Sequence, residues 1–136
     1  MEVFSIFFHK YVLHGPLWSV HKTHHKPDRS PWELNDLVSV FFGLVSVACI
    51  VWGAQLAYYS LSSFGLGIAW YGLLYFLLHD LIVHRRFNSK WSRPRNRYLA
   101  ALRRAHMQHH KYVERTPGES YGLFVFPKRF YTELKK

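Results

Sequence analysis

Ten histidines are the residues in this chain whose type and spacing could do chemistry. They form four short clusters that alternate two spacings, HxxxxH and HxxHH, and no histidine lies outside the clusters. Neutral imidazole is a common protein ligand for zinc, copper and iron. The pattern therefore predicts a metal centre built from these candidate ligands: His9, His14, His21, His24, His25, His79, His84, His106, His109 and His110.

Helical geometry favours two ions over one. Residues three apart share a helix face, so the first two histidines of HxxHH can bind one ion while the last is directed at a second ion. The two histidines of HxxxxH lie about 140° apart on a regular helix and cannot easily bind the same ion unless the helix distorts. We expect one ion on His9, His21, His24, His106 and His109, and the other on His14, His25, His79, His84 and His110.

Four polar residues near the clusters could accept hydrogen bonds from the imidazole N–H groups. These are Glu33, Asn35, Asp36 and Asp80. Asn35 or Asp36 could also cap the hydrophobic helix that follows, and for Asp36 this plain structural role is equally compatible with the sequence. Asp80 adjoins His79 at the end of an apolar stretch, which favours a role in the site.

Residues 37–83 contain a single charged residue, Asp80, and predict a transmembrane hairpin. The first apolar run, 37–59, is long enough at 1.5 Å per residue to cross a bilayer core of about 30 Å. The second run, 64–78, becomes long enough if its helix continues to Val83. We expect the turn between the spans where small polar residues gather, at Ser60, Ser62, Ser63 and Gly65.

The distribution of charge explains the net charge of +10. All 18 Lys and Arg residues lie outside the hairpin, which places both of its ends, with the histidine clusters, in the cytoplasm by the positive-inside rule. Contact with anionic lipid headgroups accounts for the basic excess, so we do not expect nucleic-acid binding. Cys49 is the single cysteine, which excludes an intrachain disulfide and a four-cysteine metal site.

The whole chain, 1–136, is predicted to be one all-α, integral membrane domain with a histidine-rich cytoplasmic cap. The apolar run 3–8 is too short to cross a bilayer, and we expect it to be the cytoplasmic end of a truncated first membrane helix, incomplete at the N-terminus. Further helices are expected at 17–25 and 95–111. Loops are expected at 26–31 and 88–96, which contain prolines.

The type of metal follows from what the sequence lacks. No HExxH motif supplies a general base and no set of thiolates points to structural zinc. An all-nitrogen, two-ion site in a membrane protein is typical of iron that activates O₂, although zinc could occupy the same ligands. An oxidant is also what a hydrocarbon substrate requires, because an unactivated C–H bond has no acidic proton to remove.

The chain closely resembles the family of bacterial β-carotene 3-hydroxylases, part of the fatty acid hydroxylase/sterol desaturase superfamily of membrane di-iron enzymes. The histidine clusters are typical of the superfamily, while ELNDL at 33–37 and YGLLYF-x-x-HD at 71–80 point to the carotenoid branch. AHMxHH at 105–110 and YGLF at 121–124 extend the resemblance over essentially the whole chain. Met1 and Glu2 match a position within the family's first membrane helix.

The resemblance implies hydroxylation at C3 of β-ionone rings, from β-carotene through β-cryptoxanthin to zeaxanthin. It also implies two iron ions, O₂ as co-substrate, no catalytic side chain beyond the ligands, and an external electron donor such as ferredoxin, which a basic face would attract. The alternatives are a sterol or fatty acyl hydroxylase or desaturase, and an inactive truncated metal-binding membrane homologue. Aromatic residues that could line a carotenoid channel are Trp52, Trp70, Tyr71, Tyr75 and Phe76.

Overall fold

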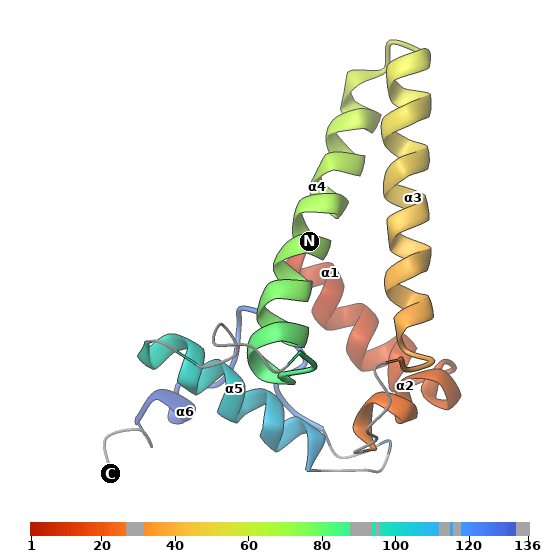
Figure 1. Ribbon diagram of the computed structural model, residues 1–136. Helices are drawn as coiled ribbons and strands as arrows, with labels where there is room; N and C mark the ends of the chain where they lie inside the picture. Colours follow the sequence, from red (N-terminus) through yellow and green to blue (C-terminus); the bar gives the residue numbers. More distant parts are fainter. Residues whose placement is uncertain (27–31, 88–93, 95, 112–114, 116–117, 133–136) are drawn as a thin grey trace.

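The chain is helical, and a long hairpin rises from a broader base (Figure 1). The computed structural model describes residues 1–26, 32–87, 94, 96–111, 115 and 118–132, and within these ranges it contains no strand. Two π-helical segments, η1 and η2, continue α1 and α4. The elements are α1 (Glu2–Phe7), η1 (Phe8–Leu13), α2 (Trp18–His25), α3 (Asp36–Gln55), α4 (Tyr59–Tyr75), η2 (Phe76–Val83), α5 (Arg97–His110) and α6 (Arg129–Thr132).

The hairpin contains two helices that are long and apolar enough to cross a membrane. They are α3, with 20 residues, and the continuous helix formed by α4 and η2, with 25 residues. Most of their large apolar side chains are exposed, as is expected where lipid rather than protein covers a helix. These observations confirm the predicted helical hairpin and give two candidate membrane spans.

The predicted position of the hairpin turn is wrong. The chain turns at residues 56–58, where Ala57 has a positive φ of 53°, and the serines expected in the turn are helical. The small residues instead let the two helices approach closely. Ser46 Oγ donates to the Gly65 carbonyl at 2.7 Å, and a Cβ on Gly65 would lie 2.8 Å from the Ser46 carbonyl oxygen.

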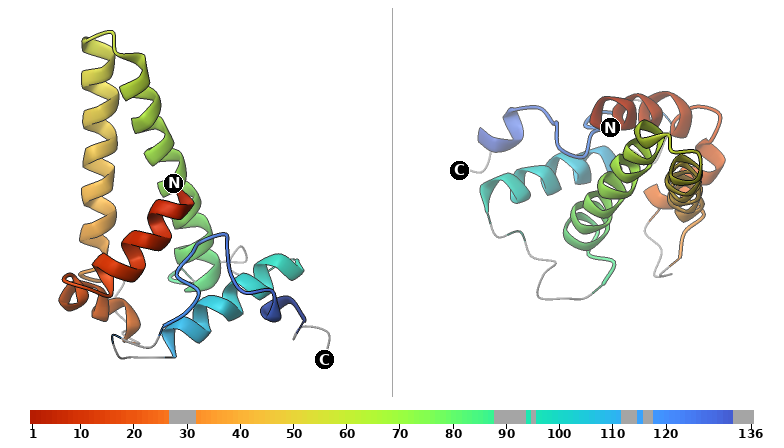
Figure 2. Two further views of the ribbon diagram at one scale, coloured as in Figure 1. Left: turned by 180° about the vertical axis from the view of Figure 1, so that it is seen from behind. Right: turned by 90° about the horizontal axis from the view of Figure 1, so that it is seen from above.

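The base of the molecule is formed by η1, α2, the lower end of η2, α5 and the segment 118–132, together called the cap. Figures 1 and 2 show α1 running alongside the lower half of the hairpin, with the N-terminus beside α4. Aromatic contacts join Phe4 and Phe8 to Phe42 of α3. The helices predicted at 17–25 and 95–111 are confirmed as α2 and α5, whereas most of the predicted loops lie outside the described residues.

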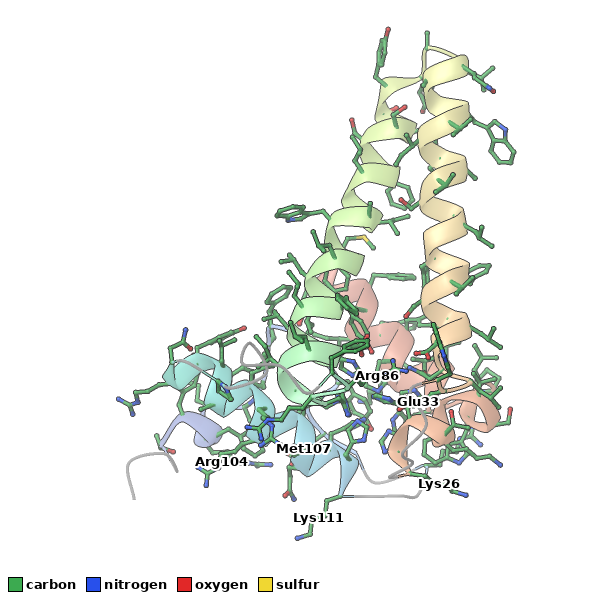
Figure 3. All side chains as sticks on the ribbon, viewed as in Figure 1. Lys26, Glu33, Arg86, Arg104, Met107 and Lys111 are labelled. Atoms are coloured by element: carbon green, nitrogen blue, oxygen red, sulfur yellow. The ribbon has the colours of Figure 1, made fainter. Side chains whose placement is uncertain are left out.

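The cap carries charged side chains, in contrast to the apolar hairpin. Figure 3 shows Lys26, Arg104 and Lys111 at the base of the molecule, on the side away from the hairpin. The start of α5 is fixed by Asn96, whose side chain accepts a hydrogen bond from the Leu99 amide, the usual arrangement at a helix N-terminus. The cap has a small apolar core, in which Ala101 and Ala105 of α5 pack against Phe130.

Candidate metal centre

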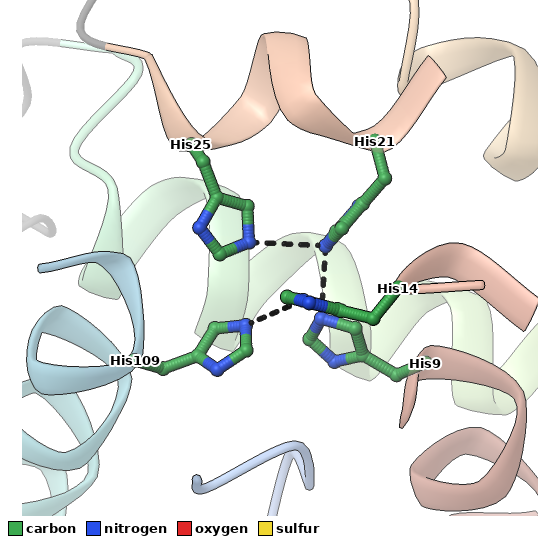
Figure 4. A group of neighbouring side chains, drawn as sticks. All are labelled: His9, His14, His21, His25 and His109. Carbon is green, nitrogen blue, oxygen red and sulfur yellow. Dashed lines mark hydrogen bonds between the residues drawn. The ribbon is translucent and has the colours of Figure 1, made fainter. Parts of the chain in front are cut away.

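All ten histidines meet beneath the hairpin, where they form two groups of five. The first group contains His9, His14, His21, His25 and His109, and Figure 4 shows their rings directed toward one another from three parts of the chain. The second group contains His24, His79, His84, His106 and His110. Within each group, one nitrogen from every imidazole lies within 4.8 Å of the others, so each group could hold a metal ion.

The predicted two groups are present, but their membership differs from the prediction. The prediction placed His79 and His84 on one ion, as the structure does, but it divided His9 and His14 between the two ions. Each HxxxxH cluster begins on a π-helix, η1 or η2, and its second histidine follows directly after that helix, where the backbone bonds run from residue i+5 to residue i. The His14 amide donates to the His9 carbonyl at 3.0 Å, and the His84 amide donates to the His79 carbonyl at 2.9 Å. Each π-helix thereby brings both histidines of its cluster to one ion position.

The HxxHH clusters also divide differently from the prediction. The first and last histidines, four residues apart, share a group: His21 with His25, and His106 with His110. The middle histidine crosses over, so His24 of α2 joins the group of α5 and His109 of α5 joins the group of α2. Each group is therefore completed by a residue from the other half of the chain.

Facing lone pairs show that a cation suits each group. His9 Nδ1 must donate to the Tyr121 carbonyl (2.9 Å), and His21 Nδ1 donates to Asn35 Oδ1 (2.8 Å). Both Nε2 atoms of these neutral rings therefore carry lone pairs, yet they lie only 2.9 Å apart. The Nε2 atoms of His24 and His79 face each other in the same way at 3.1 Å. A bound cation would convert these repulsive contacts into shared coordination.

The closest nitrogen pairs in each group lie at separations that ligands of one ion can have. These Nε2 atoms are 2.9–3.2 Å apart in the first group and 2.8–3.1 Å apart in the second. Two ligands with metal–nitrogen bonds of about 2.1 Å lie about 3.0 Å apart at a right angle and about 3.4 Å apart at the tetrahedral angle.

Neutral oxygens orient histidines of the first group. In addition to the contacts of His9 and His21, His14 Nδ1 donates to the Arg115 carbonyl at 3.0 Å. His109 Nδ1 is buried without a partner in hydrogen-bond geometry among the described residues, although the backbone of Glu119 faces it. Acceptors of this kind fix the ring tautomer and leave Nε2 free for an ion.

Carboxylates orient two histidines of the second group. His24 Nδ1 donates to Glu33 and His79 Nδ1 donates to Asp80, each at 2.7 Å. The structure thus places Glu33, Asn35 and Asp80 where the sequence predicted, against ring N–H groups. Asp36 instead forms a two-pronged ion pair with Arg86, with both N–O distances at 2.7 Å, and accepts the backbone N–H of Glu33.

Burial keeps the imidazoles neutral, as metal binding requires. It lowers the pKa of His21 to about 3, against a smaller raising effect of the hydrogen bond to Asn35. Burial, helped by the positive charge of Arg86, lowers the pKa of His84 to about 3. Burial and the adjacent His25 lower the pKa of His109 to about 2. The pKa values of His24 and His106 also lie well below the ordinary value of 6.5, chiefly because of burial.

An apolar cavity of about 510 Å³ connects the hairpin with both histidine groups. Phe4, Phe42 and Ile68 contribute to its apolar wall, and His9, His79 and His106 lie at its polar end. Of the predicted channel residues, the lining includes Tyr71, Tyr75 and Phe76. Trp52 and Trp70 do not line the cavity, because their side chains are 60% and 64% exposed on the outer surface of the hairpin.

The sequence interpretation missed several residues that support the site. Arg86 lies 3.8 Å from Asp80 while it pairs with Asp36, and its position two residues after a ligand cluster was the available signal. Glu2 accepts hydrogen bonds from Tyr71 and from the amides of Phe124 and Val125. Backbone carbonyls that hold ligands, such as that of Tyr121, have no side-chain signature.

Comparisons with known proteins agree with this site. The fatty acid hydroxylase family profile matches residues 1–130. A beta-carotene hydroxylase from Pseudescherichia vulneris is 40% identical over 95% of this chain and 72% of its own, and one from Pantoea ananas is 38% identical over 93% and 71%. The chloroplastic beta-carotene hydroxylase 2 of Capsicum annuum is 35% identical over 94% and 42%. No solved structure is significantly similar to the chain.

Proposed function

The chain belongs to the fatty acid hydroxylase family, and from this premise we propose that it is a β-carotene 3-hydroxylase that uses a di-iron centre. The observation that carries the proposal is the pair of five-histidine groups at the end of an apolar cavity between membrane-type helices. The reaction would insert oxygen from O₂ at C3 of a β-ionone ring, first giving β-cryptoxanthin and then zeaxanthin.

All ten histidines would serve as ligands, five to each iron, through the nitrogens that face one another in each group. When bound, the iron pair supplies the activation of O₂ that an unreactive C–H bond requires. The protein keeps the ligands neutral by burial and fixes their tautomers through Tyr121, Asn35, Glu33 and Asp80.

The cavity would bind one end of the carotenoid. Its volume of about 510 Å³ suits a ring with part of the adjoining polyene, and its wall is largely apolar. Tyr75 lines the cavity and stacks on His79, with its hydroxyl 3.2 Å from Nε2. Once an ion occupies that nitrogen, the hydroxyl is positioned to donate a hydrogen bond toward the reacting end of the cavity.

The membrane arrangement follows from the same features. The hairpin would cross the bilayer, and the cap would face the cytoplasm, because the basic residues lie at the cap. A hydrocarbon substrate could then enter the cavity from the lipid. The basic surface around Lys26, Arg104 and Lys111 would attract an acidic electron donor such as ferredoxin.

The test is conversion of pigment in cells that accumulate β-carotene. Cells expressing the full chain should yield β-cryptoxanthin and zeaxanthin in extracts separated by chromatography. A His106→Ala variant, which loses a ligand on α5, should yield neither product at equal abundance in the membrane fraction. Oxidised sterol or fatty acid without any xanthophyll would refute the carotenoid assignment.

A second measurement separates the enzyme from an inactive metal-binding homologue. The purified protein should bind iron and consume O₂ when supplied with reduced ferredoxin and β-carotene. Zinc that iron cannot replace, together with no O₂ consumption, would support the inactive alternative.

A further inference from the structure

Among the contacts that join described residues, the two histidine groups differ in the oxygen atoms that accept hydrogen bonds from their outward N–H groups. In the first group, three of the five histidines donate to neutral oxygens, namely two backbone carbonyls and the Asn35 side chain. In the second group, His24 and His79 donate to the carboxylates of Glu33 and Asp80. A carboxylate acceptor makes an imidazole more basic and places negative charge near the ion, which a carbonyl does not.

Arginines lie beside both groups, so the difference between the groups comes from the hydrogen-bond acceptors of their ligands. Arg115 Nε donates to the His14 carbonyl of the first group at 2.6 Å. Beside the second group, Arg86 pairs with both oxygens of Asp36 and lies 3.8 Å from Asp80, and Arg103 Nε donates to the Val83 carbonyl at 3.1 Å.

We propose that the two ion positions are inequivalent, with the second group binding its ion more tightly because Glu33 and Asp80 accept the N–H bonds of its ligands. The second position would then load first when the metal is limiting. The inference rests on the proposed function only in requiring that an ion binds at each group. It assigns to Glu33 and Asn35 the role of positioning residues that set metal affinity.

The chain offers an exchange experiment that changes little else. Glu33 and Asn35 lie two residues apart in one segment and reach His24 and His21, which are three residues apart in α2. The double variant Glu33→Gln/Asn35→Asp moves one carboxylate from the second group to the first. It conserves net charge, side-chain length and an acceptor oxygen at both places, so a change in metal affinity reports the location of the charge.

The probe is Fe(II), titrated without oxygen into the metal-free full chain in detergent against a coloured chelator. The wild type should bind two ions in separate steps. Glu33→Gln should weaken the tighter step about 10- to 100-fold, the usual range for a lost second-layer partner, and Asn35→Asp should strengthen the weaker step. The double variant should reduce or reverse the difference in Fe(II) affinity between the two steps. Glu133→Gln is the matched control, because it makes the same carboxylate-to-amide change 23 residues after the last histidine in the sequence, and it should leave both steps unchanged.

Asp80→Asn gives an independent check, because it removes the other carboxylate of the second group and should weaken the same binding step as Glu33→Gln. Helix content measured by circular dichroism would identify a variant that folds poorly, and the other variant would then carry the test. Two equal steps in the wild type, or a double variant with the wild-type profile, would overturn the inference while leaving the hydroxylase function intact. Failure of the wild type to bind iron at all would overturn the metal centre and this inference together.

Discussion

Acidifying the metal-free protein from pH 7.5 to 5.5 should strongly destabilise the cap. His21 and His84 have pKa values of about 3 and His109 of about 2 in the folded chain, against 6.5 when unfolded. Above pH 6.5 both states are neutral and these groups do not affect stability. As the pH falls from 6.5 toward 3, the unfolded state takes up protons that the folded state cannot, so the free energy of unfolding decreases.

The size of the effect follows from the pKa differences. At pH 5.5 each of the three histidines costs about 1.4 kcal/mol relative to pH 8, so together they remove about 4 kcal/mol. That loss is comparable with the total stability of many domains, about 5–15 kcal/mol. Iron bound to the ligands should shift the transition to lower pH, because protons must then compete with the metal.

The assay is thermal unfolding of the metal-free and iron-loaded protein in detergent, followed by tryptophan fluorescence at pH 7.5 and 5.5. The metal-free midpoint should fall steeply between these values, and the loaded midpoint should fall much less. A metal-free midpoint that stays constant or rises on acidification would refute the claim that the histidines are buried in neutral form.

Three further predictions concern residues other than the candidate ligands. Gly65→Leu should destabilise the hairpin by about 1–3 kcal/mol, because the new Cβ would lie 2.8 Å from the backbone of the facing helix. Unfolding at increasing concentrations of a denaturing detergent measures this loss of stability. Glu2→Ala should remove about 3 kcal/mol, because Tyr71 and two backbone amides lose their acceptor, and unchanged thermal stability would contradict it. Tyr75→Phe should lower the product formed per O₂ consumed at unchanged iron content; an unaltered ratio would show that the hydroxyl near His79 has no part in coupling.

Those parts of the fold could be predicted that depend on where charged and apolar residues lie along the sequence. A stretch with no charge except Asp80 can be stable only in lipid or in a large core, so the hairpin could be predicted. The position of its turn could not be predicted, because serine and glycine are equally suited to turns and to close contacts between helices. Ser62 shows the second use, since its hydroxyl donates to the Ile50 carbonyl across the hairpin at 3.3 Å.

The candidate ligands could be predicted, but not their division between ions. Composition and spacing pointed to all ten histidines, whereas the division depends on a backbone distortion that regular helical geometry does not anticipate. The five-residue spacing of His9 and His14 matches the i to i+5 bonding of a π-helix, and this was the available signal. The hydrogen-bond acceptors of the ligands were partly predictable. Glu33 and Asn35 have polar side chains close to α2 in sequence, whereas nothing in the sequence indicates that the Arg115 carbonyl accepts from His14.

The crossing of the two middle histidines has a consequence for how the cap is held together. His24 lies on α2 but faces the group of η2 and α5, while His109 lies on α5 but faces the group of η1 and α2. Each bound ion would therefore link the N-terminal and C-terminal parts of the cap, which has one small cluster of buried apolar residues at Ala101, Ala105 and Phe130. Because facing nitrogen lone pairs repel one another without a cation, the metal-free cap should be folded but less stable than the loaded cap. Metal binding should accordingly raise the free energy of unfolding of the cap, and the hairpin should remain helical in either form because lipid would cover it.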